Sequence, residues 1–193
     1  MVVLNRIYTR TGDRGQTRLA TGAPVPKFDP RVQAFGDVDE TNACIGLCRL
    51  HTGNDPTLDA MLARVQNELF DLGADLATPP EPKPAWEVLK VTSEQVARLE
   101  SEIDAMNSNL TPLTSFVLPG GTPLAAHLHL ARTVCRRAER RVAELSGDPD
   151  RGTSPESLRY LNRLSDLLFV ASRRANDSAG GDVLWQPGAT RGE

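Results

Sequence analysis

The stretch DPTLDAMLARVQNELFDLGADL, residues 55–76, decides the fold class. Its apolar residues recur at spacings of three and four, which places them on one face of an amphipathic helix. These residues are Leu58, Leu62, Val65, Leu69, Leu72 and Leu76. The stretch begins with Asp55-Pro56, a capping residue followed by a proline that the first helical turn tolerates. It therefore predicts a long helix with one face to bury.

The same start signal, a capping residue followed by proline, recurs at three other places in the chain. It predicts further helices over residues 29–52, 122–145 and 154–176, beginning at Asp29-Pro30, Thr122-Pro123 and Ser154-Pro155. A fifth helix is predicted from Thr92 or Ser93 to Met106. No pair of segments with an alternating β-strand pattern competes. The sequence therefore predicts an all-α fold, a five-helix up-and-down bundle of long helices joined by loops.

The segments outside the helices complete a single domain over residues 1–193. Residues 1–28 contain no helical period and predict a loop with a short strand, and residues 29–176 form the bundle. Residues 177–193 are rich in glycine and predict a flexible tail, except around Trp185. Two exposed connections are predicted at residues 78–85, where prolines exclude helix, and at residues 107–121, which end in FVLPGG.

The composition is that of a soluble globular protein: 39% of the 193 residues are hydrophobic and 24% are charged. A formal net charge of −3 gives no general attraction to nucleic acid or to anionic membranes. No apolar run is long enough to span a bilayer, and the N-terminus lacks a secretory signal pattern. We therefore expect a cytoplasmic protein without nucleic-acid or membrane partners. The cysteines, which form no metal or disulfide pattern, are expected to be buried thiols: Cys44, Cys48 and Cys135.

An arginine-rich face is predicted on the helix over residues 122–145. Arg132, Arg136 and Arg140 are spaced four apart, so their side chains form one stripe beside Glu139. Guanidinium groups arranged in this way can clamp a polyphosphate through paired hydrogen bonds. The stripe can equally be a solvated face whose arginines pair with acids on neighbouring helices. The residues alone leave both interpretations open.

Four shorter motifs have comparable alternatives. The loop YTRTGDRGQT, residues 8–17, can cradle an anion or form an ordinary turn, and it is not a Walker A loop. Asp39 lies beside Phe35 on a packable helix face, where a carboxylate usually has an arginine partner. Phe116 of FVLPGG can cap the core or form an apolar wall for a flat ligand. The stripe of Asn162, Ser165, Asp166 and Phe169 can be a hydrogen-bonding site or plain helix surface.

Taken in order, five segments resemble the PduO-type ATP:cob(I)alamin adenosyltransferases. They are TRTGDRGQT, GDVDETNACIG, FVLPGG, ARTVCRRAERR and YLNRLSDLLFVASRRAN, and they span residues 7–176. Two departures from the family pattern are Thr41, where the family usually has an aliphatic residue, and the loop at residues 79–91, which is of variable type.

The resemblance implies a homotrimer with an active site at each subunit interface. The 5′-deoxyadenosyl group of ATP would move to cob(I)alamin, giving adenosylcobalamin and triphosphate. The N-terminal segment, residues 1–28, would bind the nucleotide, with Mg²⁺ carried on the triphosphate and no other metal. A reductase would convert cob(II)alamin to cob(I)alamin, and an adenosylcobalamin-dependent enzyme would accept the product.

The resemblance also assigns site residues by matching positions. The ATP pocket would be lined by Thr9, Arg10, Thr11, Gly12, Thr17, Arg18 and Lys27 and completed by Arg136, Arg137, Glu139, Arg140 and Asn162. Phe116 would lie below the corrin ring and exclude the lower axial ligand. Arg132 would pair with Asp39 across the subunit interface. Arg136, Phe116, Asp39 and Arg132 are thus the residues predicted to govern catalysis.

Two other classes of function compete with an adenosyltransferase. A ferritin-like di-metal site requires Glu-x-x-His motifs, and the positions three before His51, His127 and His129 hold Cys48, Leu124 and Ala126. The histidines are therefore expected to be structural or surface residues. The alternative is a non-catalytic nucleotide sensor or corrinoid carrier built on the same bundle. Such a protein would bind ATP or corrinoid without releasing triphosphate, whereas an enzyme would release it.

Overall fold

Five helices and one short hairpin make up the computed structural model, which describes residues 7–53, 55–80, 84–148, 151–177 and 179–191. The helices are α1 (Pro30–Arg49), α2 (Pro56–Leu76), α3 (Ser93–Asn107), α4 (Pro123–Ser146) and α5 (Pro155–Asp177). The strands are β1 (Gln16–Arg18) and β2 (Pro24–Pro26). The predicted five-helix bundle is confirmed.

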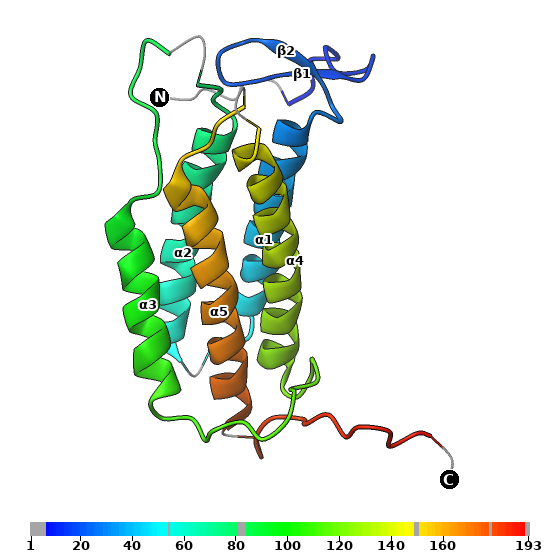
Figure 1. Cartoon of the computed structure of the whole chain (residues 1–193), viewed down its shortest axis with the longest axis vertical. Helices are drawn as coiled ribbons and strands as arrows, with labels where there is room; N and C mark the ends of the chain where they lie inside the picture. The colour runs from blue at the N-terminus through cyan, green and yellow to red at the C-terminus, as the bar shows by residue number, and fades with distance from the viewer. Residues whose placement is uncertain (1–6, 54, 81–83, 149–150, 178, 192–193) are drawn as a thin grey trace.

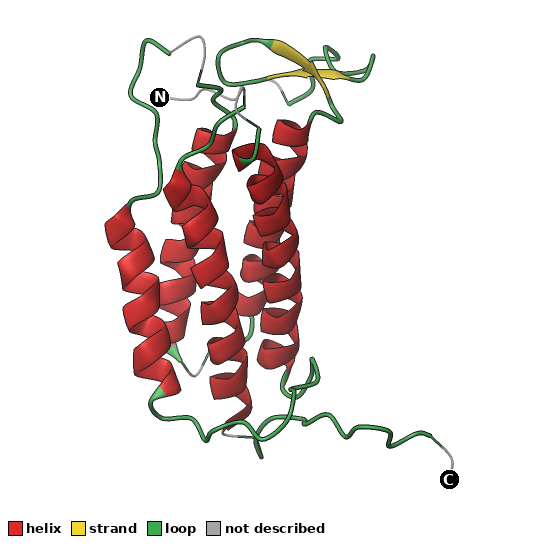
Figure 2. Cartoon of the chain, viewed as in Figure 1, coloured by secondary structure: helices red, strands yellow, loops and turns green. Residues whose placement is uncertain are grey.

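The helices alternate in direction along the bundle (Figure 1). α4 packs between α1 and α5, while α2 lies against α1 and α3 lies against α5. The loops therefore gather at two ends of the bundle (Figure 2). The hairpin lies at the end where α1 begins, and the loop containing Phe116 lies at the other end, where α4 begins.

The starts of α1, α2, α3 and α4 have the caps that the sequence predicts. The side chains of Asp29, Asp55, Thr92 and Thr122 each accept a backbone N–H of the following turn. Thr92 and Gln95 form a complete capping box at the start of α3. α1 ends at Arg49 rather than at Thr52, because the N–H groups of Leu50 and His51 bond three residues back and tighten the last turn.

The core confirms the apolar stripe of residues 55–76. Leu62, Val65, Leu72 and Leu76 are fully buried, and Leu58 and Leu69 are nearly so. The three cysteines are free and buried, as expected. No helix of the described residues is long and apolar enough to cross a membrane.

The N-terminal segment forms an antiparallel hairpin in which Thr17 lies opposite Val25. Its prolines, Pro24 and Pro26, sit on a strand of a two-stranded sheet, where missing N–H groups cost little. The N–H of Ala20 bonds the carbonyl of Ala77 at 3.0 Å, which ties the hairpin to the end of α2. The short strand expected among residues 1–28 is thus a pair of strands.

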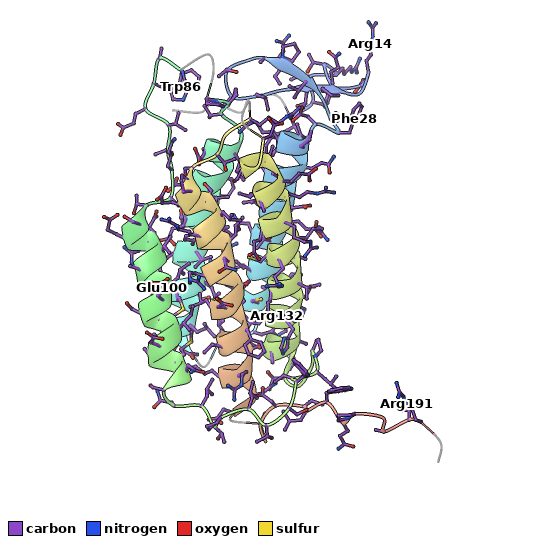
Figure 3. The ribbon with its side chains drawn as sticks, viewed as in Figure 1. Arg14, Phe28, Trp86, Glu100, Arg132 and Arg191 are labelled. Atoms are coloured by element: carbon purple, nitrogen blue, oxygen red, sulfur yellow. The ribbon has the colours of Figure 1, made fainter. Side chains whose placement is uncertain are left out.

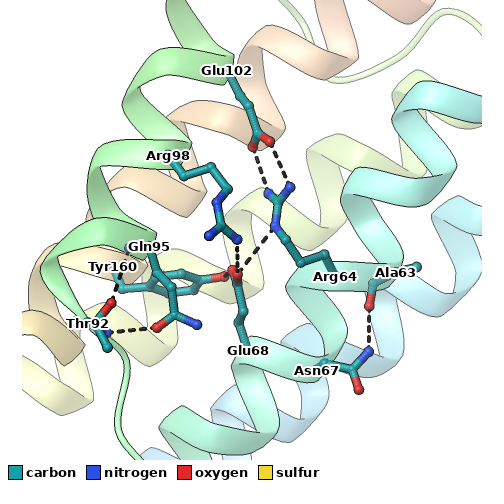
Figure 4. Close-up of polar contacts among 9 residues, drawn as sticks. All are labelled: Ala63, Arg64, Asn67, Glu68, Thr92, Gln95, Arg98, Glu102 and Tyr160. Atoms are coloured by element: carbon teal, nitrogen blue, oxygen red, sulfur yellow. Dashed lines mark hydrogen bonds and ion pairs between the residues drawn. The ribbon is translucent and has the colours of Figure 1, made fainter.

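A buried ionic cluster joins α2, α3 and α5 (Figure 4). The Glu68 carboxylate accepts the Tyr160 hydroxyl at 2.6 Å and an Arg98 N–H at 3.2 Å, and Arg64 Nε lies 3.3 Å away. Arg64 also donates two bonds of 2.7 Å to Glu102. Burial, and then the Glu68 charge, raises the pKa of Tyr160, so its hydroxyl stays a donor. The cluster holds α3 onto α2 and α5.

Replacing Glu68 with alanine should therefore destabilise the protein, because the fully buried Tyr160 hydroxyl loses its acceptor and two arginines lose their carboxylate partner. We expect the free energy of unfolding to fall by about 3–5 kcal/mol, the usual cost of breaking a buried pair. Chemical denaturation at one fixed protein concentration measures the change. Glu100→Ala, which removes an exposed acid of α3, is the matched control and should change stability by less than about 1 kcal/mol. Equal effects of the two substitutions would contradict a structural role for the cluster.

Candidate functional site

A cavity of about 430 Å³ opens in the N-terminal segment, beside the hairpin. It is lined by Thr9, Thr11, Gly12, Gln16, Thr17, Arg18, Pro24 and Lys27. Six of the seven N-terminal residues that sequence comparison assigns to ATP are in this group, and Arg10 is the exception. The lining combines hydroxyls, two cationic side chains and a glycine, which is the chemistry expected of a phosphate site.

Gly12 lets Lys27 approach the turn of this cavity. A Cβ atom at residue 12 would lie 3.2 Å from both Cε and Nζ of Lys27, so a larger side chain would displace the ammonium group. The N–H of Lys27 bonds the carbonyl of Gly15 at 2.9 Å, which fixes the lysine to the same turn. Arg10 adopts a φ of 61° and stacks 5.5 Å from the Tyr8 ring, so it points away from the cavity lining.

The hairpin is anchored to the bundle by charged residues at its base. Asp29, which caps α1, accepts an N–H of Arg151 at 3.0 Å from the α4–α5 loop. Arg31, only 3% exposed, donates to the carbonyls of Leu76 and Gly152. Burial lowers the pKa of this guanidinium. The cavity is therefore built on a fixed platform at the end of α2.

The arginine stripe of α4 is partly paired and partly free. Arg137 contacts two acids of α1, Asp37 at 3.3 Å and Glu40, and the hydrogen bond to Glu40 raises the pKa of the arginine. Arg136 is half exposed and its carboxylate neighbour, Glu139, is 3.8 Å away.

Beside them, Asn162 of α5 donates to Glu139 at 2.8 Å, so these two predicted ATP residues meet in the fold. Arg140 is exposed, and the described residues give it no ion pair. The inter-helix ion pairs are made by Arg137, which lies beside the stripe, while the stripe residues Arg136 and Arg140 keep N–H donors available to a ligand.

Asp39 and Arg132, the predicted catalytic pair, do not meet within one chain. Asp39 is exposed on α1 and lines an apolar groove of about 410 Å³ with Phe35 and Phe70. The described part of the chain gives Asp39 no hydrogen bond or ion pair. Arg132 lies on α4, and burial and then the charge of Arg136 lower the pKa of its guanidinium. Each side chain is thus left without an opposite charge of its own.

Phe116 lies at the other end of the bundle and is 77% exposed. Its carbonyl accepts the N–H of Trp185 at 2.8 Å, and the two rings are 5.9 Å apart. Val117 pairs with Leu184, so the C-terminal segment forms a short antiparallel bridge with the FVLPGG loop. The sequence predicted a flexible tail except around Trp185, and Trp185 is the residue that contacts Phe116.

The FVLPGG loop is fixed by Asn176, near the end of α5. Asn176 accepts the N–H of Thr122 at 2.9 Å and donates to the carbonyl of Gly120 at 3.1 Å. Gly121 has a φ of 98°, and a Cβ atom there would lie 2.1 Å from Asn176 Oδ1. Sequence reasoning did not identify Asn176. The Gly-Gly pair before α4 was the one signal that a side chain must approach the backbone there.

The two ends of the site are joined by the outward face of α4. Figure 3 shows Arg132 on the body of the bundle and Arg14 and Phe28 at the hairpin end. At 1.5 Å per residue, Arg132 and Arg140 lie about 14 and 26 Å along α4 from Pro123. The order along α4 is therefore the exposed aromatic residue, the arginines, and then the hairpin cavity.

Comparison with known proteins matches this arrangement to one family. A family profile described as cobalamin adenosyltransferase matches residues 7–175. The chain is 50% identical to a corrinoid adenosyltransferase of Mycobacterium tuberculosis over 191 residues, covering 98% of this chain and 97% of the relative. It is 44% identical to a corrinoid adenosyltransferase of Bacillus subtilis, covering 95% and 94% of the two chains.

Solved structures agree with the sequence relatives. A variant of the PduO-type ATP:corrinoid adenosyltransferase from Lactobacillus reuteri, complexed with cobalamin and ATP, superposes with a TM-score of 0.87 at 37% identity. The match covers 94% of this chain and 99% of that one. Another variant of that protein, complexed with ATP, superposes with a TM-score of 0.82 at 39% identity and covers 93% of this chain and all of that one.

Gly121→Ala should disturb the Phe116 end of the site, because the new methyl group collides with Asn176 and the positive φ strains alanine. The free energy of unfolding should fall by about 1–3 kcal/mol. Amide exchange should become faster mainly in residues 115–122 and 183–185. Gly120→Ala is the matched control, since nothing lies within 4 Å of a Cβ atom there. Hydrogen-exchange mass spectrometry compares the two variants, and identical exchange would contradict the anchoring role of Asn176.

Proposed function

The chain belongs to the cobalamin adenosyltransferase family. We propose that its hairpin cavity and the arginine face of α4 hold ATP, whose 5′-deoxyadenosyl group is transferred to a corrinoid bound at Phe116. The activity is ATP-dependent adenosylation of cobalamin. The observation that carries the residue assignments is the single line of groups along α4, from an exposed aromatic ring to a cationic, hydroxyl-lined cavity.

The chemistry at the two ends of α4 supports a placement for each substrate. The triphosphate is the most negative part of ATP, so it belongs at the hairpin end with Lys27 and Arg18. The corrin ring is large, flat and apolar on its faces, so it belongs over Phe116. Because the 24 residues of α4 span about 36 Å, a corrin ring on Phe116 of one copy would meet the triphosphate held at the hairpin of a neighbouring copy, with C5′ next to the cobalt. Arg136 is placed to bind the phosphates nearest the reacting carbon.

The reaction needs no side-chain nucleophile. The electron pair of Co(I) forms the bond to C5′, the C5′–O bond breaks, and its electrons leave on the triphosphate. Negative charge therefore grows on the bridging oxygen. Lys27, Arg136 and Arg140 stabilise that charge, because preorganised donors are most effective where charge develops in the transition state. Glu139 accepts a hydrogen bond from Asn162 and orients the neighbouring Arg136 side chain.

Phe116 has a different role in this scheme. It is mostly exposed and its ring is backed by Trp185. A corrin ring lying on this aromatic surface would exchange water for an apolar contact on its lower face. A lower axial ligand would then be excluded, which makes the cobalt easier to reduce and favours Co(I).

Magnesium is proposed to enter with ATP. Among the described residues there is no group of three or more His, Cys, Asp or Glu side chains that could hold a metal ion. The donors around the hairpin cavity are cationic or hydroxyl groups, which suit phosphate oxygens rather than a cation. A triphosphate-bound Mg²⁺ would neutralise leaving-group charge, while Thr9, Thr11 and Thr17 would contact the remaining oxygens.

Assembly would complete the site. Asp39 is unpaired beside exposed Phe70, and Arg132 on α4 has no carboxylate partner in the described chain. A groove and an arginine on different faces of one chain can be satisfied by a head-to-tail contact, which closes into a ring when copies are related by rotation. The homotrimer implied by the family provides such a contact, with Arg132 of each copy reaching Asp39 of the next.

The cellular context stays a prediction. Cob(II)alamin must gain one electron before it can attack C5′, and this chain contains no assigned redox group, so a separate reductase is required by the proposal. The product would pass to an adenosylcobalamin-dependent enzyme. The expected cytoplasmic location also stays a prediction.

Direct adenosylation tests the function. Purified protein, MgATP and chemically reduced cobalamin are followed by the visible spectrum, with separate measurement of triphosphate. Growth of the adenosylcobalamin bands with one triphosphate released per product is the expected result. Binding of ATP without turnover would instead identify the non-catalytic sensor or carrier.

Arg136→Ala should lower kcat/KM for ATP at least about tenfold, because one charge-assisted contact of about 1.5–3 kcal/mol is lost. The matched control is Arg159→Ala, an exposed arginine of α5 whose neighbour is Glu156. Steady-state kinetics at saturating cobalamin compare the two variants. Near-normal kinetics of the Arg136 variant would remove this residue from the ATP site.

Asp39→Asn should weaken assembly, because the amide cannot balance the charge of a partner arginine. The concentration at which the oligomer dissociates should rise at least about tenfold, which corresponds to about 1.4 kcal/mol. Sedimentation across a dilution series measures it, with Asp104→Asn on α3 as the control. An unchanged profile together with full activity would refute the interface pair.

A further inference from the structure

Four buried polar atoms near the end of the bundle where α4 begins and α5 ends have no hydrogen-bond partner among the described residues. They are His129 Nδ1, His129 Nε2, Arg132 Nε and Asp182 Oδ1. His129 is 1% exposed, and burying its ring without bonds costs free energy. Unpaired groups of this kind call for a specific explanation.

The charges of Arg132 and Asp182 both act on the His129 ring, so the three side chains lie near one another. His129 and Arg132 are three residues apart on α4, which puts them on the same helix face. The His129 ring packs against Phe169 of α5 at 6.2 Å. One turn further along α5, Arg173 donates to Asp182 Oδ2 at 2.8 Å and so holds Asp182 beside that contact.

The electrostatics agree with this placement. Burial lowers the pKa of His129, and the nearby positive charge of Arg132 lowers it further, while Asp182 acts in the opposite direction. The imidazole is therefore neutral at neutral pH, with one ring nitrogen as a donor and the other as an acceptor.

The four atoms form a complementary set. Arg132 Nε–H can only donate, Asp182 Oδ1 can only accept, and neutral imidazole does one of each. Two hydrogen bonds would satisfy every atom. We propose that His129 is a positioning residue that accepts a bond from Arg132 Nε–H and donates one to Asp182 Oδ1 when the site is loaded with corrinoid.

This relay would connect two parts of the site that share no direct contact. Arg132 is the interface arginine of the proposed assembly, and Asp182 begins the segment whose next residues pair with the Phe116 loop. Leu118 N–H bonds the carbonyl of Val183, directly after Asp182, at 2.8 Å. Fixing Asp182 would therefore hold Trp185 against Phe116, beneath the corrin ring.

The relay requires neutral His129. A protonated ring has two donors and no acceptor, so it would present an N–H to the N–H of Arg132. The charged groups facing the ring are Arg132 on α4, Asp182 in the C-terminal segment and Arg173 on α5, which is already bonded to Asp182. The relay is thus present above the pKa of His129 and is lost as pH falls through it.

The test compares two substitutions of His129. His129→Gln keeps one donor and one acceptor but cannot be protonated, whereas His129→Leu keeps the bulk and removes both. His127→Gln, an exposed position on the same helix, is the matched control. Each is made in the full chain with Trp86→Phe, so that Trp185 is the one remaining tryptophan.

Two readouts follow. With cob(II)alamin and MgATP bound, Trp185 fluorescence should change as pH falls below 6.5, the ordinary pKa of imidazole, in the unsubstituted and His127→Gln proteins. The change should be absent in His129→Gln. His129→Leu should raise KM for cobalamin about tenfold, as expected for one lost hydrogen bond to a charged group, while KM for ATP stays within about twofold.

Wild-type kinetics and an unaltered fluorescence profile in His129→Leu would overturn the relay. A pH response that persists in His129→Gln would also overturn it, because another group would then be titrating. The relay rests on the proposed roles of Arg132 and Phe116, but the fluorescence readout does not depend on turnover. Failure of adenosylation with an intact pH response would count against the proposed function alone.

Discussion

The packing of α4 between α1 and α5 is the contact on which the rest of the molecule depends. Its inward face carries small or slender residues that are fully buried, among them Ala131, Cys135 and Ala138. They let three helices approach closely, and the Cys135 thiol can donate to the carbonyl of Leu161 at 3.3 Å. Because the inward positions recur every three or four residues, Arg136 and Arg140 between them face outward and are exposed. One helix thus builds the core with one face and the candidate site with the other.

Most of the fold could be predicted from local signals. The caps at Asp29, Asp55 and Thr122 act within one turn, so sequence spacing suffices to find them. The lateral order of the helices could not be predicted, because it depends on contacts between residues far apart in sequence. Glu68 shows this: it reads as an ordinary acid on a helix, and only the fold reveals that Tyr160 and Arg98 approach it.

In the candidate site, too, some residues could be predicted from the sequence and others could not. The residues of the hairpin cavity were assigned by resemblance to the family, because the glycines, threonines and arginines of residues 8–17 suit an anion but do not identify one. The cavity brings six of the assigned residues together. Asn176 and His129 were not identified, because each looks like a helix residue of no special type. Asn176 matters because it lies against Gly121, whose φ is positive. His129 matters because it is near other unpaired buried groups.

A rigid helix also explains how a protein without a nucleophile can direct this chemistry. The rate of attack by cobalt on carbon depends on distance and alignment, and correct positioning alone can supply much of a rate enhancement. The length of α4 between Phe116 and the hairpin is set by its hydrogen-bonded turns and does not change with side-chain motion. That length is about 36 Å, which is more than ATP spans, so a corrin ring on Phe116 would meet a triphosphate held at Lys27 of a neighbouring copy, at a separation that the rigid helices fix. The buried face of α4, which carries no ligand, determines where the ligands react.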